Sequence, residues 1–355
     1  MDEFFGNHEN NDTCEQSELF IPSAWIIFTQ FGLAAESAIV NTIVIVIFLR
    51  PKNRTPSTIL LSALAASDCL TAIPAQMPYF VAYIFHYDDL EVDEYGYFGG
   101  WVWPELYSSC IVYLPLSNIS VGFHTISVCL TVMLNIQKVV ALQFPLWTML
   151  NVGNKSTVSV IFLIFIIVVS IIAWVTVTDN GLLFKGEDDA CCYGELLDHN
   201  YTKVFNTSLN NVIVFAVLGV FLCTAYICWK LWTDEKSITK NQNPIAKRKT
   251  RRSALIIVLL SVIFILSELF FILRTINQSR LVPIVPMIEM INDSFMLLSW
   301  QVGFSLNFVI YLIMSENLRN ILKSFFMALF RCKKETPLRN TSKWTSVSDN
   351  ASTHI

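Results

Sequence analysis

The chain has 355 residues, of which 54% are hydrophobic and only 15% are charged, whereas soluble domains carry about 25% charged residues. Its mean hydropathy is +0.53, its net charge is -4 and its pI is about 5.8. This composition excludes a disordered chain, a collagen, a coiled coil and a secreted disulfide scaffold, and the acidic balance argues against a nucleic-acid-binding protein. We therefore expect an integral membrane protein.

Seven apolar blocks are long enough to cross a bilayer, since a helical span needs about 20 mostly apolar residues. In chain order they cover residues 24–49, 58–85, 107–134, 157–178, 211–232, 253–275 and 284–314. The predicted fold is an all-α membrane protein, a seven-transmembrane helix bundle. We expect residues 1–23 to form the N-terminal segment and residues 24–314 the bundle.

The distribution of basic residues predicts the orientation. Twenty of the 24 lysines and arginines lie in the loops after the first, third and fifth spans or after the seventh span. Because cytoplasmic loops carry the excess of basic residues, these segments are expected inside the cell and the N-terminus outside. We expect a multi-pass protein of the plasma membrane.

Cysteines and glycosylation sequons fall on the expected outer side. Cys110 begins the third span, and Cys191 and Cys192 follow the fourth. A disulfide from Cys110 to one of that pair would hold the loop over the bundle; Cys191 is preferred, and Cys192 remains open. Three sequons predict glycosylation on this side, at Asn11, Asn200 and Asn206.

Three motifs resemble those of rhodopsin-like G-protein-coupled receptors. They are Asn41 in the first span, Leu64-Ala65-Ala66-Ser67-Asp68 in the second, and Asn307-Phe308-Val309-Ile310-Tyr311 in the seventh. The resemblance covers residues 24–332 and implies an extracellular ligand, a heterotrimeric G protein inside, and arrestin and a receptor kinase at the tail.

Further residues resemble one subgroup of these receptors. Met314-Ser315 follows the last of the three motifs. The third span contains His124-Thr125 and Leu130-Thr131-Val132, and Trp101 precedes Cys110. These features are similar to the FMRFamide, myosuppressin and sex-peptide receptor group of invertebrate neuropeptide receptors. The resemblance implies a neuropeptide ligand.

Asp68 is a carboxylate near mid-membrane, where a charge is costly unless it is paired, solvated or protonated. Asn41 and Asn307 are polar groups that can bond to it across helices. In the resembled family such a cluster is a sodium and water site that rearranges on activation. We therefore expect an activation switch that includes these residues and Tyr311, with a sodium ion near Asp68.

The sequence departs from the family pattern at three places. Gln137-Lys138-Val139 stands where the family has Asp/Glu-Arg-Tyr, so Lys138 keeps the positive charge without the planar fork of arginine. Phe308 replaces a proline, and Leu266-Ser267-Glu268-Leu269 lies near the place of Cys-Trp-x-Pro. Lys138 joins the expected activation switch, and these departures predict elevated basal activity.

The expected outer side is acidic. It holds 18 of the 28 acidic residues, a field that steers cationic ligands. Glu268, Glu289 and Asp293 lie within the sixth and seventh helices. Ionisable residues inside a membrane span are costly and usually functional. An amidated, RFamide-like peptide with an arginine would pair with such carboxylates. The expected ligand-binding residues are Glu289, Asp293, Glu268, Tyr113, Trp300 and Glu105.

The expected inner side offers a G-protein contact surface and membrane anchors. The contact residues we expect are Lys138, Lys247, Arg248, Lys249 and Arg251. Residues 315–332 have apolar side chains at helical spacing and predict a short amphipathic eighth helix on the membrane lipids, with Cys332 as a palmitoylation site. Residues 333–355 are polar and predict a disordered cytoplasmic tail.

Other functions were weighed against the same residues. A monoamine receptor lacks its aspartate in the third span, and an opsin lacks its lysine in the seventh. We find no phosphate loop, metal-spaced cluster or nucleophile motif, so no enzyme is predicted. Two alternatives stay open: a chemosensory receptor for small molecules, and a membrane transporter.

Overall fold

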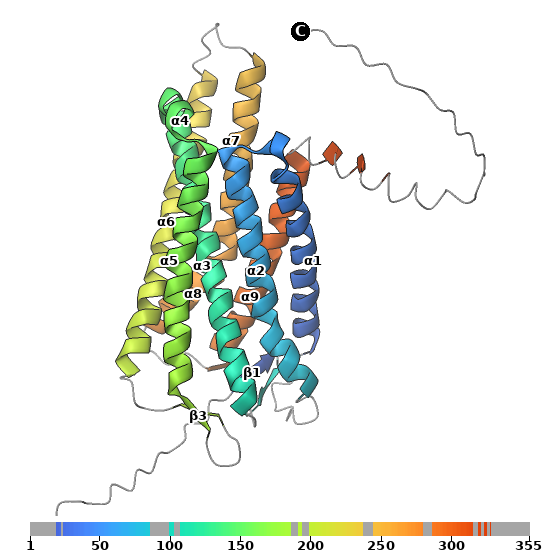
Figure 1. The fold of residues 1–355 in the computed structure, drawn as a ribbon, viewed down its shortest axis with the longest axis vertical. Helices are drawn as coiled ribbons and strands as arrows, with labels where there is room; N and C mark the ends of the chain where they lie inside the picture. The colour runs from blue at the N-terminus through green and yellow to red at the C-terminus, as the bar shows by residue number, and fades with distance from the viewer. Residues whose placement is uncertain are drawn as a thin grey trace, which may run out of the picture.

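The computed structural model describes residues 19–22, 24–85, 99–102, 107–185, 191–193, 199–236, 244–279 and 286–314, together with 319–320, 323–324 and 327. Within these ranges the chain is a bundle of long helices (Figure 1). Seven helical segments are long and apolar enough to span a membrane. This confirms the predicted seven-transmembrane fold.

Five of the spans are single helices that run through most of the bundle. They are α1 (Ala24–Phe48), α2 (Pro56–Phe85), α3 (Tyr107–Gln143), α5 (Asn154–Leu182) and α6 (His199–Lys236). The seventh is α9 (Pro286–Met314). The third helix continues to Gln143, beyond the predicted end at residue 134, and the short helix α4 (Pro145–Asn151) follows it.

The sixth span consists of two helices, α7 (Pro244–Ser267) and α8 (Leu269–Ser279), separated by Glu268. The backbone bonds continue across this residue: Glu268 N donates to Phe264 O and Ile272 N donates to Glu268 O, each at 3.0 Å. We call residues 267–269 the α7–α8 joint. It lies where the sequence departs from the Cys-Trp-x-Pro pattern.

Two small antiparallel strand pairs lie at one end of the bundle. Strand β1 (Leu19–Pro22) pairs with β2 (Gly99–Val102), with Phe20 opposite Trp101, although α1 and α2 lie between these strands in the chain. Strands β3 (Leu183–Lys185) and β4 (Cys191–Tyr193) follow one another and form a hairpin, so we call this end the hairpin end. Contacts between β3, β4 and α3 place the hairpin beside the third span.

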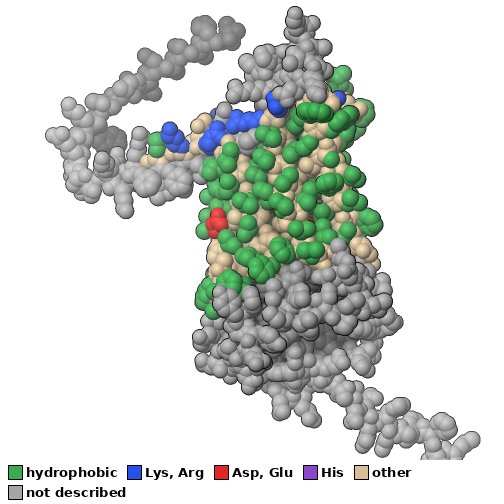
Figure 2. All heavy atoms as spheres, turned by 180° about the vertical axis from the view of Figure 1, so that it is seen from behind, with side chains coloured by type: hydrophobic (Ala, Val, Ile, Leu, Met, Phe, Trp, Pro, Cys, Tyr) green, Lys and Arg blue, Asp and Glu red, His purple; other side chains and the backbone are tan. Residues whose placement is uncertain are grey.

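The opposite end carries basic residues from several links between helices, so we call it the basic end. Arg50, Arg54, Lys155 and Arg251 lie there, and Figure 2 shows Lys and Arg side chains gathered at this end of the described surface. Beyond α9, the described residues 319–320, 323–324 and 327 are helical. The Arg319 guanidinium donates to the carbonyls of Leu312 and Ile313, capping the end of α9.

The buried apolar side chains form two clusters, one in each half of the bundle. The larger cluster lies toward the basic end and joins α1, α2, α3, α5, α6, α7 and α9. The smaller lies toward the hairpin end and includes Ala72, Phe271, Trp300 and Phe304. The sides of the bundle are mostly hydrophobic (Figure 2), as expected of helices that face lipid. Polar side chains between the two clusters therefore lie in a dry interior.

Candidate functional site

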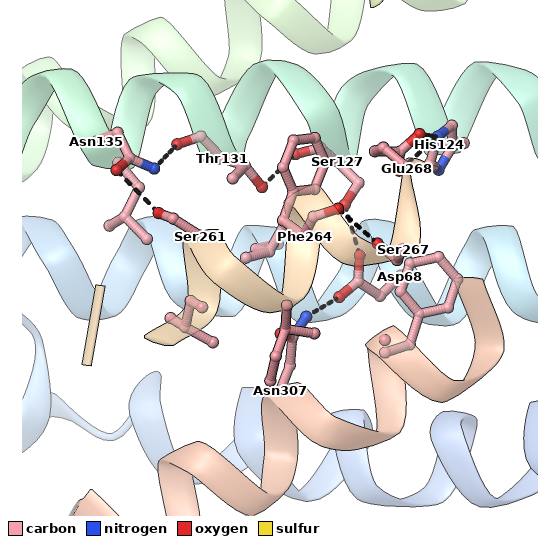
Figure 3. A pocket seen from close by; sticks show the side chains of 16 residues that line it. Asp68, His124, Ser127, Thr131, Asn135, Ser261, Phe264, Ser267, Glu268 and Asn307 are labelled. Atoms are coloured by element: carbon pink, nitrogen blue, oxygen red, sulfur yellow. Dashed lines mark hydrogen bonds and ion pairs between the residues drawn. The ribbon is translucent and has the colours of Figure 1, made fainter. Parts of the chain in front are cut away.

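Asp68 on α2 is buried and is held by two other helices (Figure 3). Ser127 on α3 donates its hydroxyl to Oδ1 at 2.6 Å, and Asn307 on α9 donates its amide to Oδ2 at 3.2 Å. Both bonds satisfy a carboxylate that would otherwise be costly in the membrane. The arrangement joins α2, α3 and α9 at one point.

The Asp68 cluster contains the kinds of donor that a sodium ion takes. Hard cations prefer oxygen ligands, and the cluster offers the Asp68 carboxylate and the Ser127 hydroxyl, while Asn307 turns its amide nitrogen toward Asp68. The cavity that these three residues help to line has a volume of about 20 Å³, which is enough for one small ion or water. These residues fit the sodium ion expected from the sequence.

A second polar group lies toward the hairpin end. Nε2 of His124 on α3 is 3.3 Å from Oε1 and 3.4 Å from Oε2 of Glu268, and both side chains are at most 2% exposed. The Trp300 indole on α9 stacks on the His124 ring, with centroids 3.7 Å apart and planes 20° apart. Trp300 is also buried, against Phe271 of α8. We call His124, Glu268 and Trp300 the His–Glu–Trp cluster.

The α7–α8 joint packs closely on α9. The hydroxyl of Ser299 donates to the backbone carbonyl of Ser267 at 2.9 Å. At Gly303, one turn further along α9, a Cβ atom would lie 3.1 Å from Cβ of Ser267. Only a glycine permits so close an approach without adjustment. Span seven therefore lies directly against the point where span six changes helix.

The two polar groups line one cavity (Figure 3). Asp68, Ser127 and Asn307 line it together with His124, Glu268 and Ser267. Its walls come from α2, α3, α7, the joint and α9. A movement of the His124 or Glu268 side chain can therefore alter the cavity that Asp68, Ser127 and Asn307 also line.

Toward the basic end, the same cavity reaches Asn135 on α3, which is 1% exposed. Its amide donates to Thr131 O at 2.9 Å, and its Oδ1 accepts from Ser261 on α7 at 2.9 Å and from Thr224 on α6 at 3.5 Å. Asn135 thus links three helices.

Lys138 lies one turn beyond Asn135 on α3. Its Nζ donates to the hydroxyl of Ser253 on α7 at 3.1 Å. Ser253 is a neutral partner, so this contact between spans three and six is a hydrogen bond and not an ion pair. The neighbouring Gln137 has a buried Oε1 that accepts no bond from the described residues.

Two expected switch residues do not bond to Asp68. The Asn41 amide donates to Ser37 Oγ at 3.0 Å, because Ser37 lies one turn earlier on the same helix. Tyr311 is 2% exposed and its ring meets Phe48 edge-on at 5.7 Å. Its hydroxyl has no partner among the described residues. Of the predicted switch, Asp68 and Asn307 are in direct contact.

Several expected residues can be placed only by their backbone. Glu289 and Asp293 lie in α9, Tyr113 and Cys110 in α3, Cys191 and Cys192 in β4, Asn200 and Asn206 in α6, and Lys247, Arg248 and Lys249 in α7. Their side chains lie outside the described part of the chain, so the disulfide and the glycosylation stay predictions. Asn11, Glu105 and Cys332 lie outside the described residues altogether.

Some buried polar residues were not anticipated as site residues. Ser127 and Asn135 on α3 carry central bonds, with Ser261 and Thr224 as partners. Ser120, His124, Ser127, Thr131 and Asn135 recur at intervals of three and four. That interval marks one face of a helix, so the sequence carried a signal for this buried stripe.

Comparison with known proteins places this arrangement in a family. A family model described as the serpentine type 7TM GPCR chemoreceptor Srv matches residues 103–326. The matched segment is well over half of the chain and includes every element from α3 to α9. A search of curated proteins finds no match. The chain belongs to the serpentine type 7TM GPCR chemoreceptor Srv family and is a G-protein-coupled receptor of the membrane.

Proposed function

We propose that this receptor is a chemoreceptor: it binds a small molecule at its hairpin end and activates a heterotrimeric G protein at its basic end. The family match supports a receptor for chemical signals. The observation that carries the proposal is the buried His–Glu–Trp cluster, which joins span three, the α7–α8 joint and span seven. A ligand that touches this cluster changes the packing of three helices at once.

The proposed orientation puts the basic end in the cytoplasm and the hairpin end outside, in the plasma membrane. The excess of lysine and arginine at the basic end supports it. Residues 1–23 are then extracellular and residues 333–355 cytoplasmic. Glycosylation at Asn11, Asn200 and Asn206 and a disulfide from Cys110 to Cys191 or Cys192 are compatible with the outer side.

In the proposed mechanism, the ligand selects between two packings of the bundle. The resting packing has His124 against Glu268 and Lys138 against Ser253. Movement of the joint shifts α7 as a unit, because the backbone bonds continue through Glu268. At the basic end this movement opens the surface near Lys138 and Arg251 to the G protein, with Lys247, Arg248 and Lys249 as further contacts. A sodium ion held by Asp68 and Ser127 would favour the resting packing by adding a positive charge beside their oxygen atoms.

A neuropeptide receptor is the second candidate function. The predicted outer side holds 18 of the 28 acidic residues, which favours a cationic, amidated peptide. Glu289 and Asp293 in the first turns of α9 are then the proposed partners of its arginine, and Tyr113 and Glu105 are further proposed ligand contacts.

A screen in G-protein reporter cells separates the two candidates. Cells expressing the receptor receive a panel of small organic molecules and a library of amidated peptides that contain arginine. We expect a small molecule to be the strongest agonist, with a potency that falls at least tenfold in Glu268→Gln and stays unchanged in Glu289→Gln and Asp293→Asn. An epitope at the N-terminus, stained on intact cells, controls for surface expression and tests the orientation.

Peptide agonists whose potency falls in Glu289→Gln and Asp293→Asn would establish the second candidate instead. A receptor that accumulates its ligand in vesicles free of G protein would contradict both and favour a transporter.

A further inference from the structure

One acidic residue lies at the middle of α1. Glu36 is 12 residues from Ala24 and 12 from Phe48, and so about 18 Å from either end of the helix at about 1.5 Å per residue. Its side chain is exposed. The hydrophobic belt of the bundle is interrupted at mid-height by acidic atoms (Figure 2). A carboxylate therefore faces the depth at which the bilayer holds only hydrocarbon.

The bundle itself satisfies only part of this carboxylate. Ser305 on α9 donates its hydroxyl to Oε2 at 2.9 Å. The other oxygen, Oε1, accepts no hydrogen bond from the residues that the structure describes. Lipid chains offer no donor, so an ionised or half-bonded carboxylate at this depth is costly. Intramembrane carboxylates in such a position mark a functional contact, and this one faces outward.

The surface around Glu36 is shaped for a helix. Phe28, Gly32, Glu36 and Ile39 recur at intervals of three and four and share one face of α1, which we call the Glu36 face. Phe28 and Ile39 are 54% and 64% exposed. A Cβ atom added at Gly32 would meet nothing within 4 Å. A small residue one turn from a polar one lets a neighbouring helix approach its backbone closely and form hydrogen bonds in lipid.

We propose that the Glu36 face is the docking surface for a membrane-spanning helix of another protein, one that carries a lysine or arginine at mid-span. A carboxylate is complemented by a cationic side chain, and within hydrocarbon such a pair is retained because the lipid chains offer neither member another charged partner. The partner's base donates to Oε1, while Ser305 keeps Oε2.

A second copy of this chain does not supply the lysine or arginine at mid-span. Every Lys or Arg within the seven described spans lies within five residues of a span end, so none reaches the depth of Glu36. Docked face to face, two copies bring two carboxylates together. The partner is therefore a different protein. Helix α1, which carries the Glu36 face, lies outside residues 103–326, the segment that the family model matches.

Energy transfer in vesicles tests the chemistry of this surface. The full-length receptor, labelled with a donor dye, is placed in phosphatidylcholine vesicles with an acceptor-labelled oligoleucine helix that has one central lysine. An oligoleucine helix without the lysine is the matched probe. We expect the lysine helix to bind at least tenfold more tightly than the leucine helix, and expect this difference to disappear in Glu36→Gln.

Two further variants separate charge from shape. Gly32→Leu blocks close approach and weakens binding of the lysine helix, while Ser170→Val, an exposed change in the middle of α5 and away from the Glu36 face, leaves its binding unchanged. The proposal is overturned by equal binding of both probe helices, by undiminished binding in Glu36→Gln, or by receptor–receptor energy transfer that Glu36→Gln abolishes. Thermal unfolding of each variant shows that the bundle is intact.

Crosslinking in the cells that express the receptor then identifies the natural partner. A photoreactive residue at Ile39 is expected to capture a protein whose spanning helix carries a mid-span lysine or arginine, and to lose it in Glu36→Gln. Capture of a helix without such a residue would overturn the proposal.

Discussion

Nε2 of His124 on α3 lies 3.3 Å from Oε1 of Glu268, the residue at which span six passes from α7 to α8. Both side chains are almost fully buried, so each is the other's main substitute for water. Because Glu268 lies in the α7–α8 joint, this contact ties the position of span three to the packing of span six.

The two residues should be energetically coupled. Glu268→Leu leaves the His124 imidazole buried without its partner, so we expect the free energy of unfolding to fall by about 1–3 kcal/mol. His124→Phe should cost a similar amount, and the double variant less than the sum of the two. Thermal and chemical unfolding of the purified receptor in nanodiscs gives the four values of the cycle. Strictly additive losses would show that the pair is not coupled.

Sodium should stabilise the receptor through Asp68. When the sodium concentration is about ten times the dissociation constant, a bound ion stabilises the folded state by about 1.4 kcal/mol. We expect the unfolding temperature to be higher in sodium chloride than in choline chloride at equal ionic strength. In Asp68→Asn, which keeps the shape but not the charge, this difference should vanish. A sodium effect that persists in Asp68→Asn would place the ion elsewhere.

Lys138 should restrain the resting receptor only weakly, because its single bond to Ser253 is not a salt bridge. The wild type is therefore expected to show measurable basal GTP exchange. Lys138→Ala removes this hydrogen bond between α3 and α7 and should raise basal exchange severalfold. GTP exchange is measured in membranes from cells that express the wild type, from cells that express Lys138→Ala, and from mock-transfected cells. A wild type without any basal signal would count against the prediction.

Asn135 should matter for stability more than an exposed asparagine does. Asn135→Ala removes the acceptor of Ser261 and Thr224, and we expect it to lower the free energy of unfolding by about 1–3 kcal/mol. Asn151→Ala is the matched control, because Asn151 is exposed and bonds only within its own short helix. Unfolding in nanodiscs compares the two. Equal effects would mean that the bonds among α3, α6 and α7 contribute little.

The seven spans could be predicted because length and hydropathy alone decide them. The split of span six could not, since no proline marks residues 253–275 and the break at Glu268 depends on packing against Ser299 and Gly303 of α9. The strand pairs β1–β2 and β3–β4 were also not anticipated, because short strands give little periodicity.

The polar interior was predicted in part. Asp68 and Asn307 stand out as polar residues in apolar spans, and the structure brings them into contact. The pairing of His124 with Glu268 joins residues 144 positions apart, so only the fold reveals it. The motifs led to the prediction of a G-protein-coupled receptor, which the family match supports. The rhodopsin-like class and the neuropeptide subgroup rested on short residue matches, and the family match does not support them.

The most direct test of the account is ligand-stimulated GTP exchange with purified components. The receptor in nanodiscs is mixed with a heterotrimeric G protein and the small molecule that the reporter screen identifies, and exchange is followed for the wild type and for Glu268→Gln. The account predicts that the small molecule accelerates exchange in the wild type and has little effect in Glu268→Gln at equal receptor concentration. Exchange that ignores the small molecule, or a full response in Glu268→Gln, would contradict it.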